Sequence, residues 1–425
     1  MRTAGTDGRG IQMTATDAGG VVDPTAVHGP LVSAPVADSY PVVDYDANGY
    51  DYRTYWAGRD YESWAEGRAL NRLLANRVGR VRWFADFGGG FGRNAGHYLG
   101  RSDQAVVMDY SATNLRNAAE LHREHVLAGR LHLVRCDLMA VPFRDFAFDG
   151  AMVMRVLHHL SDVDGGLAEM GRTVGGRWIV DVPIKHHPLG LLRAAARGQL
   201  RRVRDGAPML VGSEEPYWNF HLDAIRGRLR ALGWRPTLGA SVNNLRRWDR
   251  VVPRRLRPLA APLARSAEAI LQSVGRGWWG PSQLVMAHRY DSVTLPTSPT
   301  WPGGRGAASV DELPPALQGL ARRMVCPVCV RALKWTPAEA FCESCGSGYR
   351  RDDGFWDFVA ARPHAAPASL NALPPAAVPT VARPAMPGLP QVPGLSRRPR
   401  NAGHYRPAPA PASAEATPAG HDRAT

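Results

Sequence analysis

Short apolar runs and segments of helical spacing alternate along the first two thirds of this 425-residue chain. The apolar runs predict strands at residues 82–87, 105–109, 131–135, 150–156 and 177–182. Further along, the pattern predicts a helix at 221–233, a strand at 236–242 and a last strand at 283–288. Because strands that alternate with helices pair mainly in parallel, we expect an α/β fold with helices on both faces of a mainly parallel sheet.

A glycine-rich turn at residues 86–92 follows the first predicted strand and leads into a segment of helical composition. Gly88, Gly90 and Gly92 let the backbone turn sharply, and they let a ligand lie against the main chain where a Cβ would collide. Asp109 ends the second predicted strand, which places a carboxylate where a ribose diol would bind. The turn therefore predicts a site for a nucleoside-like cofactor.

Two kinds of cofactor compete for this turn. Residues 90–95 satisfy the G-x-G-x-x-A pattern of dinucleotide-binding proteins. Asp86, however, lies two residues before the first glycine, and a carboxylate there suits the amino group and sulfonium of S-adenosylmethionine better than a pyrophosphate. Asp137, after the third predicted strand, is placed to accept the exocyclic amine of an adenine. Both carboxylates favour S-adenosylmethionine.

These features resemble those of class I S-adenosylmethionine-dependent methyltransferases, and most closely the group that includes the quinone C-methyltransferases. The likeness rests on Asp86, the three glycines, Asp109, Asp137, a Pro-Phe…Phe-Asp series at 142–149 and Leu-His-His-Leu at 157–160. It covers roughly residues 50–290. The resemblance implies a Rossmann-like sheet with a late antiparallel strand at 283–288, and an aromatic segment at 50–62 that folds over the methionine end of the cofactor.

His158 and His159 follow the fourth predicted strand, at the edge of the sheet where ligands bind in open α/β folds. Histidine suits the removal of a proton from an oxygen, nitrogen or carbon-acid nucleophile at neutral pH, so these two residues are the candidate general bases. A His-His pair at a strand end is also a common packing element, and both interpretations stay open. Cys136 lies on the cofactor side, which argues against a covalent cysteine mechanism.

Four of the five cysteines form two C-x-x-C pairs separated by twelve residues: Cys326 with Cys329, and Cys342 with Cys345. Two such pairs close a tetrahedral thiolate site, which predicts a structural Zn²⁺ in a module of about 40 residues. The module resembles the zinc-ribbon activator proteins that partner tRNA and protein methyltransferases. That resemblance implies a ribbon that stabilises the catalytic part, here within one chain.

The chain carries 52 Lys and Arg against 38 Asp and Glu, a net charge of +14, and only Lys185 and Lys334 are lysines. Arginines concentrate at residues 185–216 and 246–265, which predicts either phosphate binding or solvated helix faces. No apolar run approaches the length of about 20 residues that spans a bilayer, and no signal-peptide core is present, so we expect a cytoplasmic protein.

The predicted organisation is a disordered N-terminal segment at 1–45, a methyltransferase domain at 46–291, a linker at 292–319, a four-cysteine zinc ribbon at 320–361 and a Pro/Ala-rich disordered tail at 362–425. The predicted function is methyl transfer from S-adenosylmethionine, with a small-molecule acceptor slightly favoured over RNA or protein. The alternative is a non-catalytic scaffold that recruits a partner through its ribbon. The sequence leaves the acceptor atom and the oligomeric state open.

Overall fold

The structure is a computed structural model that describes residues 46, 49–160, 162–211, 217–246, 248–289 and 308–363. The segments expected to be disordered, residues 1–45 and all but the first two residues of 362–425, lie outside this description. None of the described helices is long and apolar enough to cross a membrane.

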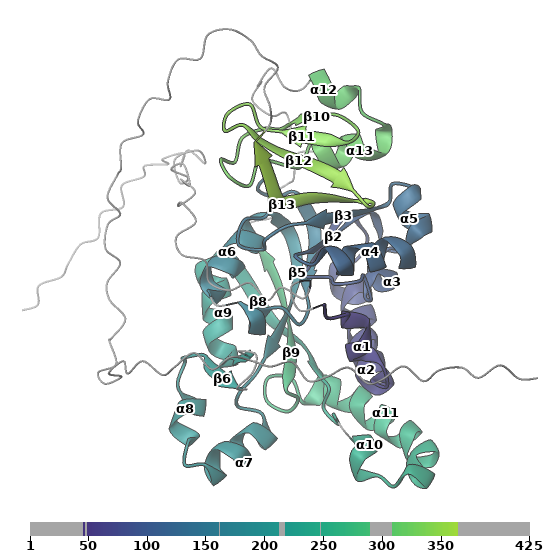
Figure 1. Cartoon of the computed structure of the whole chain (residues 1–425). Helices are drawn as coiled ribbons and strands as arrows, with labels where there is room; N and C mark the ends of the chain where they lie inside the picture. Colours follow the sequence, from purple (N-terminus) through teal and green to yellow (C-terminus); the bar gives the residue numbers. More distant parts are fainter. Residues whose placement is uncertain are drawn as a thin grey trace, which may run out of the picture. The chain divides into compact units, whose positions relative to one another are not determined.

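One large sheet organises the fold, in the order β10-β11-β12-β13-β3-β2-β1-β4-β5-β9-β8 (Figure 1). Its catalytic part consists of β1 (Val81–Phe87), β2 (Ser102–Asp109), β3 (Leu131–Arg135), β4 (Phe148–Val153), β5 (Val174–Pro183), β8 (Trp234–Val242) and β9 (Ser282–Arg289). The first five strands pair in parallel, and β9 runs antiparallel between β5 and β8. The mainly parallel sheet with a late antiparallel strand is confirmed.

β2 and β5 each begin three residues earlier than predicted, and β4 ends at Val153 and not at residue 156. Arg155 takes a left-handed backbone conformation with φ of 58°, and this residue turns the chain out of the sheet. The next residues form a short 3₁₀ helix, η2 (Leu157–His159), that holds both predicted histidines.

Helices cover both faces of the sheet. They are α1 (Tyr52–Trp56), α2 (Asp60–Leu73), the π-helical η1 (Leu74–Val78), α3 (Ala95–Tyr98), α4 (Ala112–Leu121), α5 (Arg123–Leu127), α6 (Val163–Arg172), α7 (Pro188–Ala196), α8 (Leu200–Arg204), α9 (Leu222–Ala231), α10 (Trp248–Val251), η3 (Arg254–Leu256) and α11 (Arg257–Val274). A small hairpin, β6 (Met209–Val211) with β7 (Tyr217–Asn219), lies between α8 and α9. The predicted helix at 221–233 corresponds to α9.

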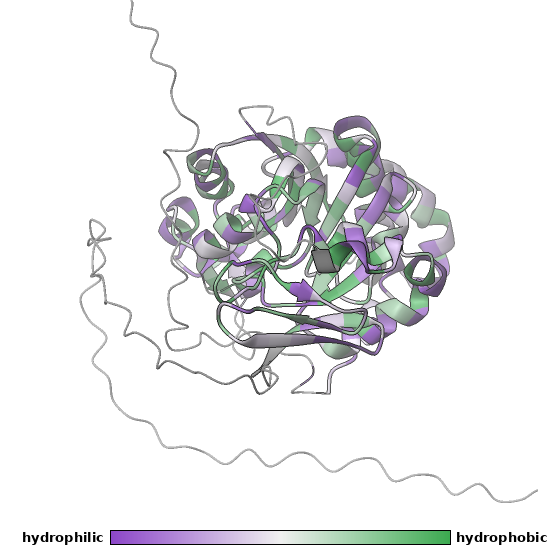
Figure 2. Ribbon diagram, turned by 90° about the horizontal axis from the view of Figure 1, so that it is seen from above, coloured by the Kyte–Doolittle hydropathy of each residue, from purple (hydrophilic) through white to green (hydrophobic). Residues whose placement is uncertain are grey.

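Alternating side chains of each strand feed two apolar cores. Trp83 and Phe87 of β1 belong to one core, and Phe84 belongs to the other. In Figure 2 the hydrophobic colouring follows the strands in the middle of the fold, while polar residues gather on the outer helices. The site at the carboxyl ends of the strands is therefore built on a rigid, doubly covered sheet.

The C-terminal module continues the same sheet. It contains α12 (Ala308–Asp311), α13 (Pro315–Ala321), β10 (Lys334–Trp335), β11 (Glu339–Phe341), β12 (Ser347–Asp352) and β13 (Phe355–Pro363). β13 pairs in parallel with β3, so that Trp356 lies opposite Val134 and Asp357 opposite Arg135. The expected linker at 292–319 is described only from residue 308, and from there it forms two helices that pack into the core through Val310 and Leu317.

Candidate cofactor and acceptor site

The predicted glycine turn lies at the carboxyl end of β1 and has the backbone geometry that requires glycine. Gly88, Gly90 and Gly92 have φ of 65°, 57° and 72°, values that side chains with a Cβ rarely adopt. A Cβ on Gly88 would also collide with Cγ2 of Val156, so the turn passes close to the segment that follows β4. The glycines thus serve both the turn and its close packing.

Asp86 is fully buried beside this turn and is incompletely satisfied. The Tyr98 hydroxyl donates to its Oδ2 at 3.1 Å, while its Oδ1 is buried with no hydrogen-bond partner among the described residues. Burial raises the pKa of Asp86 to about 7, although the Tyr98 hydrogen bond acts in the opposite direction. A buried carboxylate oxygen that lacks a donor is suited to receive a cation or an N–H group from a ligand.

Asp109 ends β2 directly beside the turn and orders it. The backbone N–H of Gly90 donates to Asp109 Oδ2 at 2.8 Å, and the Ser111 N–H and the Asn114 side-chain amide donate to Oδ1 at 3.0 and 3.2 Å. Burial raises the pKa of Asp109 despite these donors. The carboxylate predicted to bind a ribose is therefore adjacent to the glycines, as the spacing suggested.

Asp137 lies just beyond β3, at the same edge of the sheet as Asp109, because Asp109 pairs with Arg135. Its Oδ1 accepts the backbone N–H of Met139 at 2.8 Å, and the residue is half-buried. Neighbouring Cys136 is buried, and burial raises the pKa of its thiol well above the ordinary value. The thiol is therefore protonated and unreactive at neutral pH.

The aromatic N-terminal segment covers the turn. A Cβ on Gly90 would lie 3.3 Å from the Tyr52 ring, and Tyr52 stacks on Tyr55 with ring centroids 5.6 Å apart. Farther upstream, the Asp46 carboxylate accepts the backbone N–H groups of Ala112 and Thr113 at 2.7 and 3.1 Å. Asp46 thereby caps α4 and fixes the start of the segment against the catalytic domain.

A buried ion network holds this segment to the sheet. Glu66 of α2, only 2% exposed, accepts from Arg93 at 2.5 Å and from Arg155 at 2.9 Å. Burial alone would raise the pKa of Glu66, but the two guanidinium groups outweigh it and lower that pKa. Arg155 also donates to the Tyr55 hydroxyl, and the Arg93 guanidinium lies 3.5 Å from the centroid of a Trp56 ring.

A pocket of about 200 Å³ opens beside this network. It is lined by Tyr50, Tyr52, Tyr55, Arg155, His158, His159 and Tyr217. The His158 ring stacks on Tyr217 with centroids 4.8 Å apart, and the two histidine rings lie 4.0 Å apart. Burial lowers the pKa of His159 to about 4 and that of His158 well below its ordinary value, so both rings are neutral at pH 7.

The two cysteine pairs come together as one cluster. All four Sγ atoms lie within 4.8 Å of one another. Both pairs make the same turn: the N–H of Val330 donates to the Cys326 carbonyl at 2.8 Å, and the N–H of Gly346 donates to the Cys342 carbonyl at 2.9 Å. Matched turns that present four sulfurs to one point are typical of a closed tetrahedral metal site.

The Glu66 network could not be predicted from the sequence. Glu66, Arg93 and Arg155 lie far apart along the chain and belong to no short motif, so nothing in their spacing predicts an ion pair. The dense aromatic residues at 50–62 did predict a segment that covers the site. They did not predict that Arg93 and Arg155 lie against it.

Comparison with known proteins finds a family model over part of the chain and two partly similar relatives. Residues 85–177 match the family model described as "Methyltransferase domain". An O-methyltransferase, cnsE, of Penicillium expansum is 27% identical over 147 residues, which cover 33% of this chain and 53% of that protein. An uncharacterized protein, syc1184_c, of Synechococcus sp. is 27% identical over 174 residues, which cover 40% of this chain and 38% of that protein. The chain thus spans about half or less of the length of these relatives.

Among solved structures, the 1,6-didemethyltoxoflavin-N1-methyltransferase of Burkholderia thailandensis, with bound 1,6-didemethyltoxoflavin and S-adenosylhomocysteine, is 18% identical to this chain. The match covers 60% of this chain and 94% of that enzyme, with a TM-score of 0.36. The family match, in contrast, falls directly on the glycine turn, Asp109 and the paired histidines. Residues 85–177, which hold these features, are therefore similar to the methyltransferase domain that the family model describes.

Proposed function

We propose that this chain is an S-adenosylmethionine-dependent methyltransferase whose acceptor binds in the pocket between the aromatic segment and the paired histidines. The single observation that carries the proposal is the meeting of two features at one sheet edge. One is the glycine turn with the incompletely satisfied carboxylate of Asp86. The other is the adjoining pocket lined by tyrosines, Arg155 and two neutral histidines.

The residues at the turn fit the cofactor. Asp86 offers its buried Oδ1 to the methionine amine, which is the kind of donor that this oxygen lacks. Asp109 receives the ribose hydroxyls beside Gly90, and Asp137 receives the adenine amine at the neighbouring strand end. When bound, S-adenosylmethionine supplies a methyl group activated by its sulfonium.

The other residues of the site align the acceptor with the methyl group and exclude water. Methyl transfer requires the nucleophile, the methyl carbon and the sulfur in line, so a rigid pocket wall contributes directly to rate. The Glu66 network fixes Arg155 and Tyr55 in that wall. His158 or His159 accepts the proton of the acceptor, and burial, which lowers the pKa of both rings, keeps them in the neutral form that can do so at pH 7.

The size and lining of the pocket favour a small, planar acceptor. A volume of about 200 Å³ holds a group the size of one or two rings, and tyrosines on several sides favour stacking against it. RNA and protein acceptors would have to insert a single base or side chain. We therefore favour a small molecule.

The four-cysteine cluster is the structural zinc site of this enzyme. The donor set fits, because four thiolates within 4.8 Å of one another leave no open coordination position for catalysis. The module is then an intramolecular stabiliser: β13 covers the edge of β3, and the N–H of Val325 donates to the Pro142 carbonyl at 3.1 Å. Removal of residues beyond about 290 should lower the melting temperature of the catalytic part, and an unchanged melting curve would contradict this role.

The test of the function is transfer of a radiolabelled methyl group from S-adenosylmethionine into fractionated host extract. We expect label in the small-molecule or lipid fraction, with loss of transfer in His159→Ala or His158→Ala and unaltered cofactor binding. His125→Ala on α5 is the matched control and should transfer normally. Label in RNA or protein would assign the acceptor to that class, and a failure to bind S-adenosylmethionine would replace the enzyme by the scaffold alternative.

A further inference from the structure

Two helical segments at the carboxyl edge of the sheet expose leucines and valines in place of polar residues. One segment is α7–α8, which follows β5, and the other is α10–α11, which follows β8. Since β9 is antiparallel to both of these strands, β5 and β8 end at the same edge of the sheet. Figure 1 shows both segments at the same end of the catalytic domain.

The exposed apolar residues of α11 form one stripe. Leu259 and Leu263 are 76% and 73% exposed, and Ile270 and Val274 are each 62% exposed. These positions are separated by four, seven and four residues, so they lie on the same side of the helix. Val251, just before the helix, is 84% exposed. A contiguous apolar stripe of this kind marks an interaction surface.

The α7–α8 segment also exposes leucines among basic residues. On α7, Leu189 and Leu192 are 58% and 66% exposed. Residues 185–211 contain six basic residues and one acidic residue, Asp205, and Asp205 already binds Lys185 at 2.7 Å. The exposed leucines therefore stand in a strongly cationic surface.

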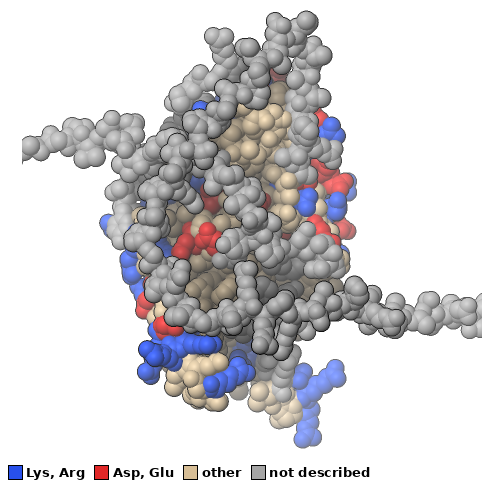
Figure 3. Space-filling model, turned by 60° about the vertical axis from the view of Figure 1, so that its left-hand side comes forward, with Lys and Arg blue, Asp and Glu red and all other residues tan. Residues whose placement is uncertain are grey.

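Arginines around the α11 stripe outnumber the carboxylates that could neutralise them. Arg254, Arg255 and Arg265 make no ion pair with another residue in the part of the chain that the structure describes. Residues 246–281 contain eight arginines and two acidic residues, of which Glu268 is completely buried. Blue and tan side chains accordingly dominate the lower end of the view in Figure 3.

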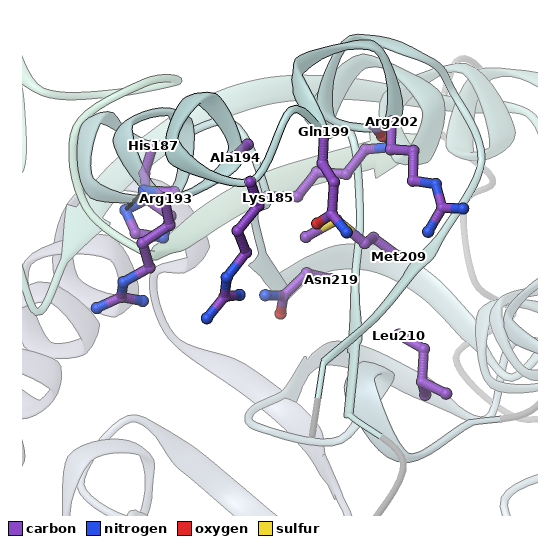
Figure 4. Close-up of a pocket in the computed structure, with 11 residues that line it drawn as sticks. Lys185, His187, Arg193, Ala194, Gln199, Arg202, Met209, Leu210 and Asn219 are labelled. Atoms are coloured by element: carbon purple, nitrogen blue, oxygen red, sulfur yellow. Dashed lines mark hydrogen bonds between the residues drawn. The ribbon is translucent and has the colours of Figure 1, made fainter. Parts of the chain in front are cut away.

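A pocket of about 560 Å³ lies at the α7–α8 segment and has the lining of an anion site. Arg193 of α7 and Arg202 of α8 extend on two sides of it, with Asn219 of β7 between them in the view of Figure 4. Arg197 and Gln199 complete the polar wall, and Met209 and Leu210 provide an apolar one. Guanidinium and amide groups beside an apolar wall suit a phosphate that is attached to an acyl chain.

We propose that α7–α8 and α10–α11 together dock this protein onto an anionic lipid bilayer, with leucines inserted at the interface and a lipid phosphate in the Arg193–Arg202 pocket. Helices with apolar side chains on one face and arginines around them bind membrane interfaces in this way. A second copy of the chain would place like charges opposite each other, and nucleic acid would leave the leucine stripe in water. The proposal holds whether or not the methyltransferase activity proposed above is correct.

The test is co-sedimentation of the full chain with vesicles of phosphatidylcholine alone or of equal parts phosphatidylcholine and phosphatidylglycerol. We expect binding to the anionic vesicles only, and weaker binding at high salt. Leu259→Ser combined with Leu263→Ser should weaken binding at least tenfold, because about two leucine side chains no longer enter the interface. Leu127→Ser on α5 is the matched control, since Leu127 is 75% exposed and Figure 1 shows α5 at the opposite end of the domain.

A second pair of variants tests the charges. Arg193→Gln with Arg197→Gln should weaken binding about fivefold for each arginine, whereas Arg123→Gln on α5 should have no effect. All variants change exposed residues, and unchanged melting curves verify that they fold. Failure to bind anionic vesicles at low salt overturns the proposal. The proposal is also overturned if the Leu127→Ser control weakens binding as much as the stripe variants do. Light scattering then decides the occupant: a dimer that the stripe variants dissociate assigns the face to a second copy.

Discussion

The affinity of this protein for S-adenosylmethionine should rise with pH up to about 7, because Asp86 must be ionised to face the methionine ammonium. In the free protein, burial raises the pKa of Asp86 to about 7. Below that pH the carboxyl is neutral, and cofactor binding must expel its proton. Each pH unit below about 7 should therefore weaken the affinity by about tenfold.

The raised pKa of Asp86 also makes the folding stability depend on pH. The stability of the cofactor-free protein should fall as the pH rises, whereas the cofactor affinity should rise. A folded-state pKa of about 7 against an ordinary value of 3.8 means that folding favours the neutral form. The contribution of Asp86 to stability is complete below pH 3.8 and is lost as the pH rises through about 7. This rise in the pKa of Asp86 corresponds to about 4 kcal/mol at most, so Asp86→Asn should stabilise the cofactor-free protein at pH 8 by up to that amount.

The assay is isothermal titration with S-adenosylhomocysteine, which carries the same amino group, from about pH 5.5 to about pH 7.5, where that amine stays protonated. Buffers of different protonation enthalpy will show the release of one proton at the acidic end. Asp86→Asn should bind weakly and without pH dependence, while Asp103→Asn, an exposed carboxylate on β2, should behave as the wild type. Equal affinity of the wild type at all these pH values, or a slope that persists in Asp86→Asn, would refute the assignment of Asp86 to the amine.

Three further predictions concern the turn, the cysteine cluster and the buried ion network. Asp109→Ala should weaken cofactor binding in equilibrium dialysis by at least about tenfold, whereas Asp137→Ala, at a half-buried turn, should have a smaller effect. Cys345→Ser should lower both the zinc content by atomic emission and the melting temperature, and Cys136→Ala should retain one zinc per chain. Glu66→Gln leaves the partly buried guanidinium groups of Arg93 and Arg155 without their carboxylate and should cost about 3–5 kcal/mol in urea unfolding, and a loss below about 1 kcal/mol would show that the network is dispensable.

The sheet and the turn could be predicted from sequence because their signals are local. Strands buried on both faces appear as short apolar runs, and the left-handed backbone of Gly88, Gly90 and Gly92 restricts those positions to glycine. The position of Asp109 beside the turn could be predicted from the length of one β-α-β unit. The helices at the start of the C-terminal module were missed, since Pro, Gly and Ser before residue 308 indicated a linker and α12 and α13 are short.

The pocket proposed for the acceptor could be predicted only in part. His158 and His159 follow a strand, which is a sequence property, whereas Tyr217 and Tyr50 reach the same pocket from elements far away along the chain. The left-handed conformation of Arg155 also has no sequence signature, because its cause is tertiary: its backbone N–H donates to Asp181 on β5 at 3.1 Å. Side chains that only the tertiary fold brings together have no characteristic spacing along the sequence, so their contact cannot be predicted from it.

Arg135 connects the C-terminal module to the cofactor edge of the sheet. Its guanidinium donates to Asp357 of β13 at 3.0 Å and to the main-chain oxygen of Tyr110 at 2.8 Å. Tyr110 directly follows Asp109, the carboxylate assigned to the ribose. If β13 separated from β3, Arg135 would lose Asp357 and keep only the Asp46 carboxylate, 3.9 Å away, so it would hold the backbone after Asp109 less firmly. The module therefore reaches the backbone beside Asp109 through the Arg135–Asp357 ion pair and the pairing of β13 with β3.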